Sequence, residues 1–287
     1  MGVLPKTTVP DALRPLPAVL AECGRFPLWV AGTLVYALGR DRAERGTPAP
    51  TAPGDVLLDG RGQHRCLAAI SRADGPYAAP EERLHPNQPA GEPAAVYRLC
   101  ALLCHLLRGE PLWETGLKAR RAALRETAAA CAPPQQAEEL FHLLDRGLRL
   151  EPSRRYPSVA DLLATADSLE ARMNEAARDT WMIRGAVGFF AGQVLLPRLP
   201  AVLGRQPGRC QILFPPETAG VSRLHCRLAY NWGSVLVTDL ASRYGTYLDG
   251  ARLSPHVPAA WEAGVLLTLG SEKQALRLVG QAKSGEI

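Results

Sequence analysis

The spacing of apolar residues changes near residues 175–181, and this change constrains the fold more than any other feature of the sequence. Before it, apolar residues recur at helical spacing; in "FPLWVAGTLVYALGRDRAERG" they are Leu28, Ala31, Leu34, Val35 and Leu38. After it, short alternating or apolar runs are separated by Gly and Pro turns, which is typical of a β-sandwich. The sequence therefore predicts a multidomain α+β protein, in which a mainly α-helical domain precedes an all-β domain.

Three further segments of the first part predict helices. "AVYRLCALLCHLLRG" (95–109) is apolar on most of its circumference, which indicates a buried helix. "QQAEELFHLLDRGLRL" and "SVADLLATADSLEARMNEAARD" predict amphipathic helices, and Ser158 is suited to cap the second. Upstream of them, "DVLLDGRGQHRCLAAI" predicts a β-hairpin with its turn at residues 59–62.

Composition excludes several classes of protein. The 287 residues fit about two domains, and the net charge of +5 includes no Lys/Arg run that would indicate a nucleic-acid partner. No apolar stretch is long enough to span a bilayer, and the N-terminus lacks the layout of a signal peptide. The seven cysteines form no C-x-x-C pair, so neither a zinc site nor a disulfide framework is predicted. We therefore expect a cytoplasmic protein without metal or cofactor, and with neither nucleic-acid nor membrane binding.

The stretch "AGVSRLHCRLAY" (219–230) carries the chemistry of the β part. Ser222 and Arg223 come directly before an alternating strand, and Arg205 follows the apolar run "AVLG". A hydroxyl and a guanidinium from separate loops suit one phosphate group, because both donate short hydrogen bonds to an oxyanion. Seven arginines against three acidic residues between Arg198 and Arg252 fit an anion-binding surface.

The order of motifs GR, SRxH and DLxSxxGTxxxG resembles the forkhead-associated (FHA) domain over about residues 181–280. The resemblance implies an eleven-stranded sandwich that binds phosphothreonine peptides with the loops at one end. Arg205 and Ser222 would contact the phosphate, and Arg223 would face the peptide. The implied phosphopeptide-binding residues are Arg205, Ser222, Arg223, Ser242, Arg243 and Tyr244, and the residues that support them are Gly204, His225, Gly245 and Thr246.

Two residues depart from the family pattern in the loop after Ser242. Arg243 and Tyr244 stand where the family usually has Thr-Asn, whose Asn holds the peptide backbone. Arg243 either adds a second guanidinium to the phosphate or points to solvent. His225 would brace the loops by hydrogen bonding, and Gly245 with Thr246 would shape the last loop.

The helical part resembles the C-terminal lobe of a protein kinase over about residues 12–170. Ala79-Pro80-Glu81 matches the APE motif, and Arg155 falls where the family keeps an arginine that pairs with that glutamate. The resemblance implies a partly buried, structural ion pair between Glu81 and Arg155. An unrelated helical bundle is the alternative if both matches arise by chance.

The catalytic parts of a kinase are missing from this region. The N-lobe is expected to be absent, and the alignment places Pro50 at the catalytic Asp, Asp55 at the metal-binding Asn and Ala68-Ala69-Ile70 at DFG. A base and a magnesium ligand are thereby lost, so we expect a degenerate pseudokinase lobe and no enzymatic activity.

These interpretations divide the chain into a kinase-like domain (1–172), a helical linker (173–180), an FHA sandwich (181–280) and a tail (281–287). The leading hypothesis is a non-catalytic adaptor in bacterial-type Ser/Thr kinase signalling. Its FHA domain would bind a phosphothreonine-containing protein, such as a Ser/Thr kinase or its substrate.

The pseudokinase lobe would bind a second protein, or a second copy of the chain, through an apolar face formed by Trp29, Cys66, Leu67, Ala68, Ala69 and Ile70. Two alternatives remain open. One is a kinase-like subunit completed in trans by another chain, and the other is a structural component of an assembly whose FHA contacts do not depend on phosphate.

Overall fold

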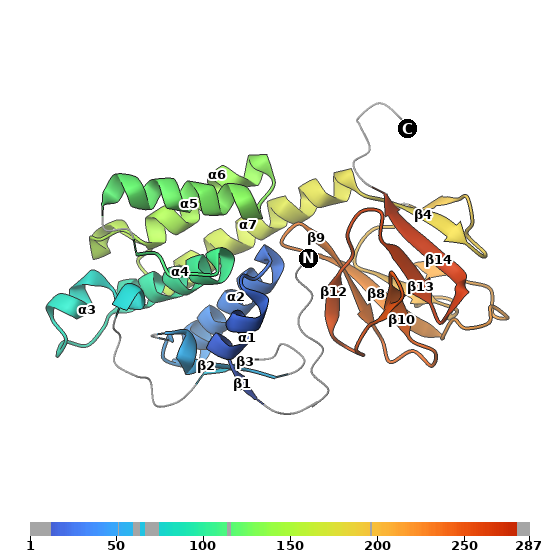
Figure 1. The fold of residues 1–287 in the computed structure, drawn as a ribbon, viewed down its shortest axis with the longest axis horizontal. Coiled ribbons are helices and arrows are strands. Elements are labelled where there is room, and N and C mark those ends of the chain that lie inside the picture. Colours follow the sequence, from blue (N-terminus) through green and yellow to red (C-terminus); the bar gives the residue numbers. More distant parts are fainter. Residues whose placement is uncertain are drawn as a thin grey trace. The chain divides into compact units, whose positions relative to one another are not determined.

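The chain divides into two compact units, Met1–Ala171 and Arg172–Ile287, drawn as a ribbon in Figure 1. The computed structural model describes residues 13–50, 52–59, 64–66, 75–113, 116–195 and 197–279. The first unit is mainly helical and the second is a β-sandwich, so the predicted multidomain α+β class is confirmed.

The helical unit is built on seven α-helices and one small sheet within its described residues. The helices are α1 (Leu16–Cys23), α2 (Leu28–Arg45), α3 (Pro80–Leu84), α4 (Glu92–Arg108), α5 (Leu117–Cys131), α6 (Pro134–Gly147) and α7 (Val159–Thr180), the last of which continues into the second unit. The strands β1 (Arg14–Pro15), β2 (Val56–Leu58) and β3 (His64–Cys66) form an antiparallel sheet in the order β1-β2-β3.

The α4 helix is the centre of this unit's core, as its apolar circumference predicts. Twelve of its residues are buried, and it ends at Gly109 in the left-handed conformation that glycine favours. The α7 helix begins with a reciprocal cap, in which Ser158 Oγ accepts from the Asp161 amide (3.2 Å) and the Ser158 amide donates to the Asp161 carboxylate (3.1 Å). The predicted hairpin is the β2–β3 pair, whose turn lies outside the described residues.

The second unit is a sandwich of two sheets, formed by eleven strands within its described residues. One sheet has the order β11-β10-β13-β14-β4-β5 and the other the order β12-β9-β8-β6-β7. The strands are β4 (Met182–Val187), β5 (Val194–Leu195), β6 (Ala201–Gly204), β7 (Ile212–Leu213), β8 (Leu224–Asn231), β9 (Ser234–Asp239), β10 (Thr246–Leu248), β11 (Ala251–Arg252), β12 (Pro258–Ala260), β13 (Leu266–Leu269) and β14 (Ser271–Val279).

The apolar alternation of β8 points into the sandwich. Cys226 and Leu228 are fully buried there with Leu203, Val237 and Trp261. His225, on the other face of β8, is also fully buried, because the loops described below cover it.

Residues 173–180, predicted as a helical linker, are the C-terminal part of α7. Met173 is fully buried, and the Asn174 side chain accepts a hydrogen bond from the Gly233 amide (2.9 Å) in the β8–β9 turn. This part of the helix therefore packs on the sandwich and belongs to the second unit, in agreement with the division after Ala171.

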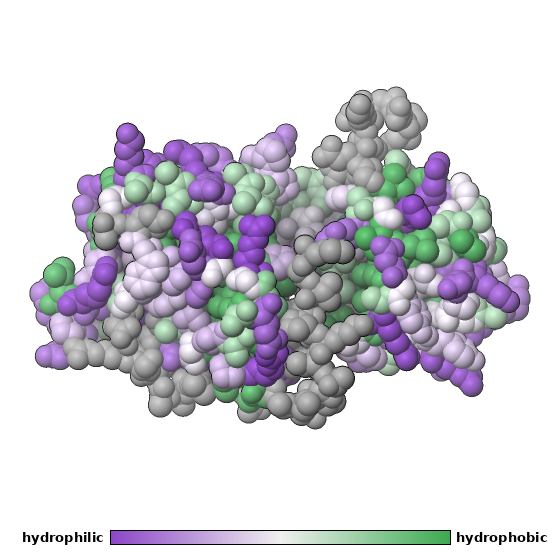
Figure 2. Space-filling view, in the orientation of Figure 1, coloured by the Kyte–Doolittle hydropathy of each residue, from purple (hydrophilic) through white to green (hydrophobic). Residues whose placement is uncertain are grey.

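Figure 2 shows hydrophilic residues over much of the visible face, with smaller groups of apolar residues between them. In the described ranges, no helix combines the length and the hydropathy that a bilayer crossing needs.

Candidate functional site

The predicted site residues meet where three loops come together, at the ends of β6, β8 and β9. The Arg205 amide, directly after β6, donates to the carbonyls of Ser222 (3.2 Å) and Arg223 (2.9 Å), which precede β8. The Arg243 amide, in the β9–β10 loop, donates to Ser222 Oγ (3.0 Å). The structure thus brings together Arg205, Ser222, Arg223 and Arg243 from three segments of the chain.

Ser222 has the geometry of an anion ligand. Its oxygen already accepts one hydrogen bond from Arg243, and its amide donates to His225 Nδ1 (3.0 Å). A hydroxyl has one proton to donate, and no described residue receives that proton from Ser222. The half-buried hydroxyl is therefore oriented by the protein and keeps its donor for a ligand.

Arg205 holds the β7–β8 loop in addition to facing the site. Its Nε donates to the carbonyl of Val221 and its Nη1 to the carbonyl of Pro216. Among the described residues, no acceptor contacts its Nη2, which leaves one donor group of this half-buried guanidinium for an anion.

His225 joins two loops by hydrogen bonds. Because Nδ1 accepts from the Ser222 amide, the ring proton is on Nε2, which donates to the Gly245 carbonyl (3.2 Å). Burial disfavours the charged imidazolium and lowers the pKa of His225 below its ordinary value. The site therefore depends on a neutral histidine.

Asp239 is a functional residue that the sequence analysis missed. Its buried carboxylate accepts from the Ser242 amide (3.1 Å), the Ser242 hydroxyl (2.6 Å) and the Thr246 hydroxyl (2.5 Å). The sequence signal that could have found it is an aspartate at the end of a strand with a serine three residues later. At this spacing an aspartate side chain often accepts a hydrogen bond from a backbone amide of the following turn.

This arrangement corrects the prediction for Ser242. The residue is buried, and its hydroxyl proton is held by Asp239, so it cannot donate to a peptide phosphate. Ser242 holds the β9–β10 loop instead, as does the fully buried Thr246 through its hydrogen bond to Asp239.

Two glycines allow the loops to approach one another. A Cβ at Gly204 would lie 2.2 Å from the Arg223 carbonyl oxygen, which no side chain can do. Gly245 has φ +86° and its carbonyl accepts from both His225 and the Gly270 amide (2.9 Å). Both positions therefore favour glycine, and their support of a bound peptide stays a prediction.

Arg223, Arg243 and Tyr244 are exposed at the surface of this loop cluster. The Arg243 guanidinium carbon lies 5.4 Å from the centroid of the Tyr244 ring, a cation–π arrangement. Arg243 therefore lies at the surface over Tyr244, and a contact between its guanidinium and the phosphate stays a prediction.

Comparison with known families identifies this fold. The model of the FHA domain matches residues 201–270, which contain β6 to β13 and the loops that carry the site. The C-terminal unit contains an FHA domain. Its predicted peptide-facing end is the loop cluster around Ser222.

Individual relatives cover only parts of either chain. Zeaxanthin epoxidase of Nicotiana plumbaginifolia is 34% identical over 74 residues, which are 24% of this chain and 11% of that enzyme. A tRNA dimethylallyltransferase of Thioalkalivibrio sulfidiphilus is 30% identical over 158 residues, 53% of this chain and 43% of that protein. The chain therefore spans less than half of these curated relatives.

Among solved structures, the FHA domain of a Chlamydia trachomatis protein covers 36% of this chain and 99% of its own, with 21% identity and a TM-score of 0.31. An FHA domain from Arabidopsis thaliana covers 38% of this chain and 92% of its own, with 21% identity and a TM-score of 0.34.

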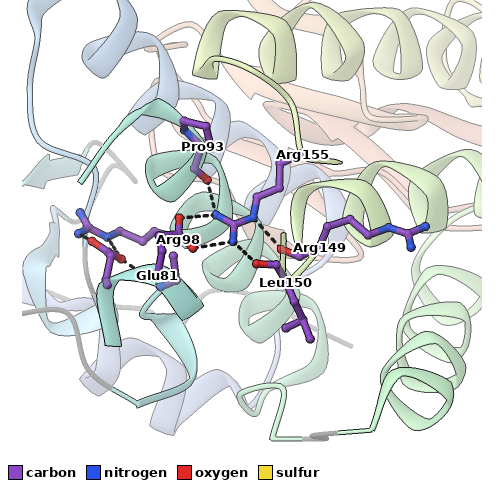
Figure 3. Close-up of polar contacts among 8 residues, drawn as sticks. Glu81, Pro93, Arg98, Arg149, Leu150 and Arg155 are labelled. Atoms are coloured by element: carbon purple, nitrogen blue, oxygen red, sulfur yellow. Dashed lines mark hydrogen bonds and ion pairs between the residues drawn. The ribbon is translucent and has the colours of Figure 1, made fainter. Parts of the chain in front are cut away.

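The helical unit contains the ion pair between Glu81 and Arg155, drawn in Figure 3. The Arg155 side chain is fully buried, and its Nη1 and Nη2 donate to the two carboxylate oxygens of Glu81 at 2.7 and 2.8 Å. Its remaining donors reach the carbonyls of Pro93 (2.9 Å), Arg149 (2.6 Å) and Leu150 (2.9 Å). All five N–H groups of the guanidinium are thus used within the protein, which makes its role structural.

The surroundings of Glu81 keep its carboxylate charged. Burial by itself would raise the pKa of Glu81, but the hydrogen bonds and charge of Arg155 outweigh it and hold the pKa below the ordinary value. A second, unpredicted pair lies next to it, where Arg98 binds Glu82 and the Glu82 carboxylate accepts from the Ala79 amide (3.0 Å).

The positions aligned with kinase catalytic residues are only partly described. Pro50 and Asp55 are buried, and the Asp55 carboxylate accepts from the Ala52 amide (3.1 Å). Leu67, Ala68, Ala69 and Ile70 lie outside the described residues. Trp29 is partly exposed, and the side chain of Cys66 is not described, so the predicted apolar face stays a prediction. The described part of the chain holds no group of three His, Cys, Asp or Glu side chains placed to bind a metal ion.

Proposed function

We propose that this protein is a non-catalytic adaptor whose FHA domain binds phosphothreonine in a partner protein. FHA domains bind phosphothreonine peptides, and one was solved with such a peptide. The observation that carries the proposal for this chain is the Ser222 hydroxyl. The Arg243 amide fixes the hydroxyl oxygen, which keeps its proton for a ligand. The Ser222 backbone is held by His225, which accepts from its amide, and by the Arg205 amide, which donates to its carbonyl.

The charge of the loop cluster supports the same ligand. A phosphothreonine carries a charge near −2 at neutral pH and three acceptor oxygens. Arg205 and Ser222 supply donors to it, and Arg223 and Arg243 add positive charge at the surface. Charge-assisted hydrogen bonds of this kind contribute about 1.5–3 kcal/mol each, which is enough to distinguish a phosphorylated from an unmodified threonine.

The test is calorimetric titration of the full chain with a degenerate phosphothreonine peptide library, and with its phosphoserine and unmodified counterparts. We expect a Kd that is roughly micromolar, equivalent to about −8 kcal/mol, for phosphothreonine only. Ser222→Ala and Arg205→Ala should each weaken binding at least about tenfold.

Arg277→Ala is the matched control, because this exposed arginine lies on β14, opposite the start of β13 and away from the site. Circular dichroism should show that the variants stay folded, which matters for Arg205 since it holds a loop. No heat with any phosphopeptide would refute the proposed function.

For the helical unit, we propose a pseudokinase lobe that docks a second protein, in the cytoplasm and within Ser/Thr kinase signalling of the bacterial type. The contact between Glu81 and Arg155 supports it, because these are the positions that the APE-motif resemblance pairs. Pro50 offers no side-chain base where a kinase needs an aspartate.

This part of the proposal predicts that Mg-ATP does not bind. A thermal-shift measurement with Mg-ATP should therefore show no change in the Tm, because a compound that does not bind the native state shifts no equilibrium. A stabilisation of several degrees that disappears in Asp55→Ala would contradict it and favour a subunit that is completed in trans. Partner capture that survives phosphatase treatment would instead favour phosphate-independent assembly contacts.

A further inference from the structure

The outer face of the six-stranded sheet carries two arginines in direct register. Arg184 of β4 lies opposite Arg277 of β14, and both side chains are exposed. Residues directly opposite on neighbouring strands have their side chains on the same face of the sheet, about 5 Å apart. Like charges in this position destabilise a sheet, and a bound anion removes that repulsion.

The described part of the domain neutralises neither arginine. Neither guanidinium forms an ion pair or a hydrogen bond with another described residue. The carboxylate of Asp249 accepts from the Leu266 amide (2.8 Å), and that of Asp239 is buried within its own loop. In the helical unit, by contrast, arginines are repeatedly paired with Glu or Asp. The positive charge on this face is therefore available to a partner.

Apolar side chains continue the row on both sides of the two arginines. Val194 of the edge strand β5 lies opposite Arg184. Leu266 of β13 lies opposite Arg277. Figure 1 shows β4, β14 and β13 side by side. The residues that form this row, called here the arginine row, are in order Val194, Arg184, Arg277 and Leu266.

The surroundings of the arginine row are apolar and partly exposed. Val194 is 50% exposed, and Leu266 is partly exposed. Met182 lies opposite Val279, and both are partly exposed. They are two residues from the arginines along their strands, so they face the same side of the sheet. A free anion would cover only the two guanidinium groups, whereas a protein segment with apolar side chains covers the whole row.

The spacing of the arginine row fits an α-helix that lies across the strands. Neighbouring strands are about 4.8 Å apart, so the row spans about 14 Å from Val194 to Leu266. One face of an α-helix presents the positions i, i+4, i+7 and i+11, which extend over about 16 Å at a rise of about 1.5 Å per residue. Each of these helix positions can therefore reach one strand of the row.

We propose that the arginine row is a docking surface for an amphipathic helix of a partner protein, whose contact face has two carboxylates between two apolar side chains. The carboxylates bind Arg184 and Arg277 through paired hydrogen bonds. The apolar side chains cover Val194 and Leu266. A second copy of the chain fits this face less well, because a two-fold contact would bring the arginines of both copies together. This surface goes beyond the proposed function, since it needs no phosphate.

The experiment uses the full chain and a fluorescein-labelled, sixteen-residue peptide that a lactam bridge on its far face holds helical. Leucine occupies its second and thirteenth positions, glutamate the sixth and ninth, and alanine and glutamine the others. In fluorescence anisotropy the peptide should bind, and replacing both glutamates with glutamine, or both leucines with alanine, should weaken binding at least about fivefold. Binding should also weaken as salt is raised, because exposed charge pairs are screened.

The variant Arg277→Glu tests the arginines directly. It should weaken binding of the glutamate peptide at least about tenfold. Its Tm should not fall, because the substitution puts an opposite charge across from Arg184. Arg227→Glu is the matched control, because this exposed arginine lies on β8 in the other sheet, and it should leave peptide binding unchanged. The double variant Arg184→Glu/Arg277→Glu should instead bind a peptide in which lysine replaces both glutamates.

Each outcome decides the inference. Peptide binding that is absent, that does not depend on the glutamates, or that persists in Arg277→Glu would overturn it. A dimer in sedimentation that dissociates in Arg277→Glu would also overturn it, as would binding to phosphatidylserine vesicles that this variant abolishes, because either result assigns the face to another occupant. Arg277→Glu should keep the affinity for phosphothreonine peptides, so failure of this surface and failure of the proposed function are distinguishable.

Discussion

Replacing Arg155 with methionine removes a fully buried side chain whose five N–H groups all donate hydrogen bonds. The change deletes two hydrogen bonds to Glu81 and leaves the carbonyls of Pro93, Arg149 and Leu150 without this donor (Figure 3). It also removes a guanidinium whose carbon lies 4.9 Å from the centroid of the Tyr97 ring. Methionine keeps the apolar volume of the side chain but restores none of these contacts.

The magnitude follows from how deeply each partner is buried. Removing one member of a buried ion pair costs about 3–5 kcal/mol, because the other charge is left unpaired. The Arg155 side chain is 0% exposed, but that of Glu81 is 29% exposed and its carboxylate can regain contact with water. We therefore expect a loss at the lower end, about 3 kcal/mol in the free energy of unfolding of the helical unit.

The neighbouring Arg154 provides a matched control. Its side chain is 67% exposed and pairs with Glu151 at the surface, where an ion pair contributes little, so Arg154→Met should cost less than about 0.5 kcal/mol. The double variant Arg155→Met/Glu81→Gln should be no less stable than Arg155→Met, because the unpaired charge is then gone.

The assay is urea unfolding of the full chain, combined with hydrogen exchange of the α4 amides, which reports the helical unit separately. The lowered pKa of Glu81 adds a pH test. A carboxylate with a depressed folded-state pKa stabilises above its unfolded value, near 4.5, and that stability is lost as the pH falls through the folded-state pKa. A loss below 1 kcal/mol for Arg155→Met, or one equal to that of Arg154→Met, would refute this reasoning.

Three further predictions concern the FHA loops. Asp239→Asn should lower the free energy of unfolding by about 2 kcal/mol, because an amide cannot accept the three hydrogen bonds that the carboxylate receives. It should also weaken phosphopeptide binding. Chemical denaturation measures the first effect and calorimetric titration the second. Gly245→Ala and Gly250→Ala should each cost about 1–2 kcal/mol in unfolding free energy, because their φ values of +86° and +78° strain any side chain, and because the exposed Arg252 side chain beside Gly245 can move aside; no loss in denaturation at either position would contradict this. Burial lowers the pKa of His225 below about 6.5, the value expected in the unfolded chain. The stability that the neutral ring contributes is therefore present above about pH 6.5 and is lost as the pH falls through the folded-state pKa. Thermal unfolding of His225→Asn should show a flatter pH dependence over that range.

Local patterns in the sequence predicted part of the secondary structure: helical segments that correspond to α2, α4, α6 and α7, and the β2–β3 hairpin, but not α1, α3 or α5. Helical spacing with a glycine stop defines α2 and α4, and the alternation at Leu224–Asn231 defines β8, because these signals depend on residues that are neighbours in the chain. The motif spacing also pointed to Arg205 and Ser222, which lie in loops near strand ends, and to His225, which lies near the start of β8. The pairing of Glu81 with Arg155 could be proposed only through a family resemblance.

The tertiary structure alone decided what each polar side chain contacts. Ser242 and Ser222 look equivalent in the sequence, as hydroxyls at strand ends. The fold buries Ser242 against Asp239 and leaves the proton of Ser222 available, because β9 and β10 bring Asp239 and Thr246 together across the loop. Arg252 lies beside Gly245 only because β11 folds back on β10. Contacts of this kind join residues that are distant in the chain, and their geometry is set by strand pairing, which no local spacing encodes.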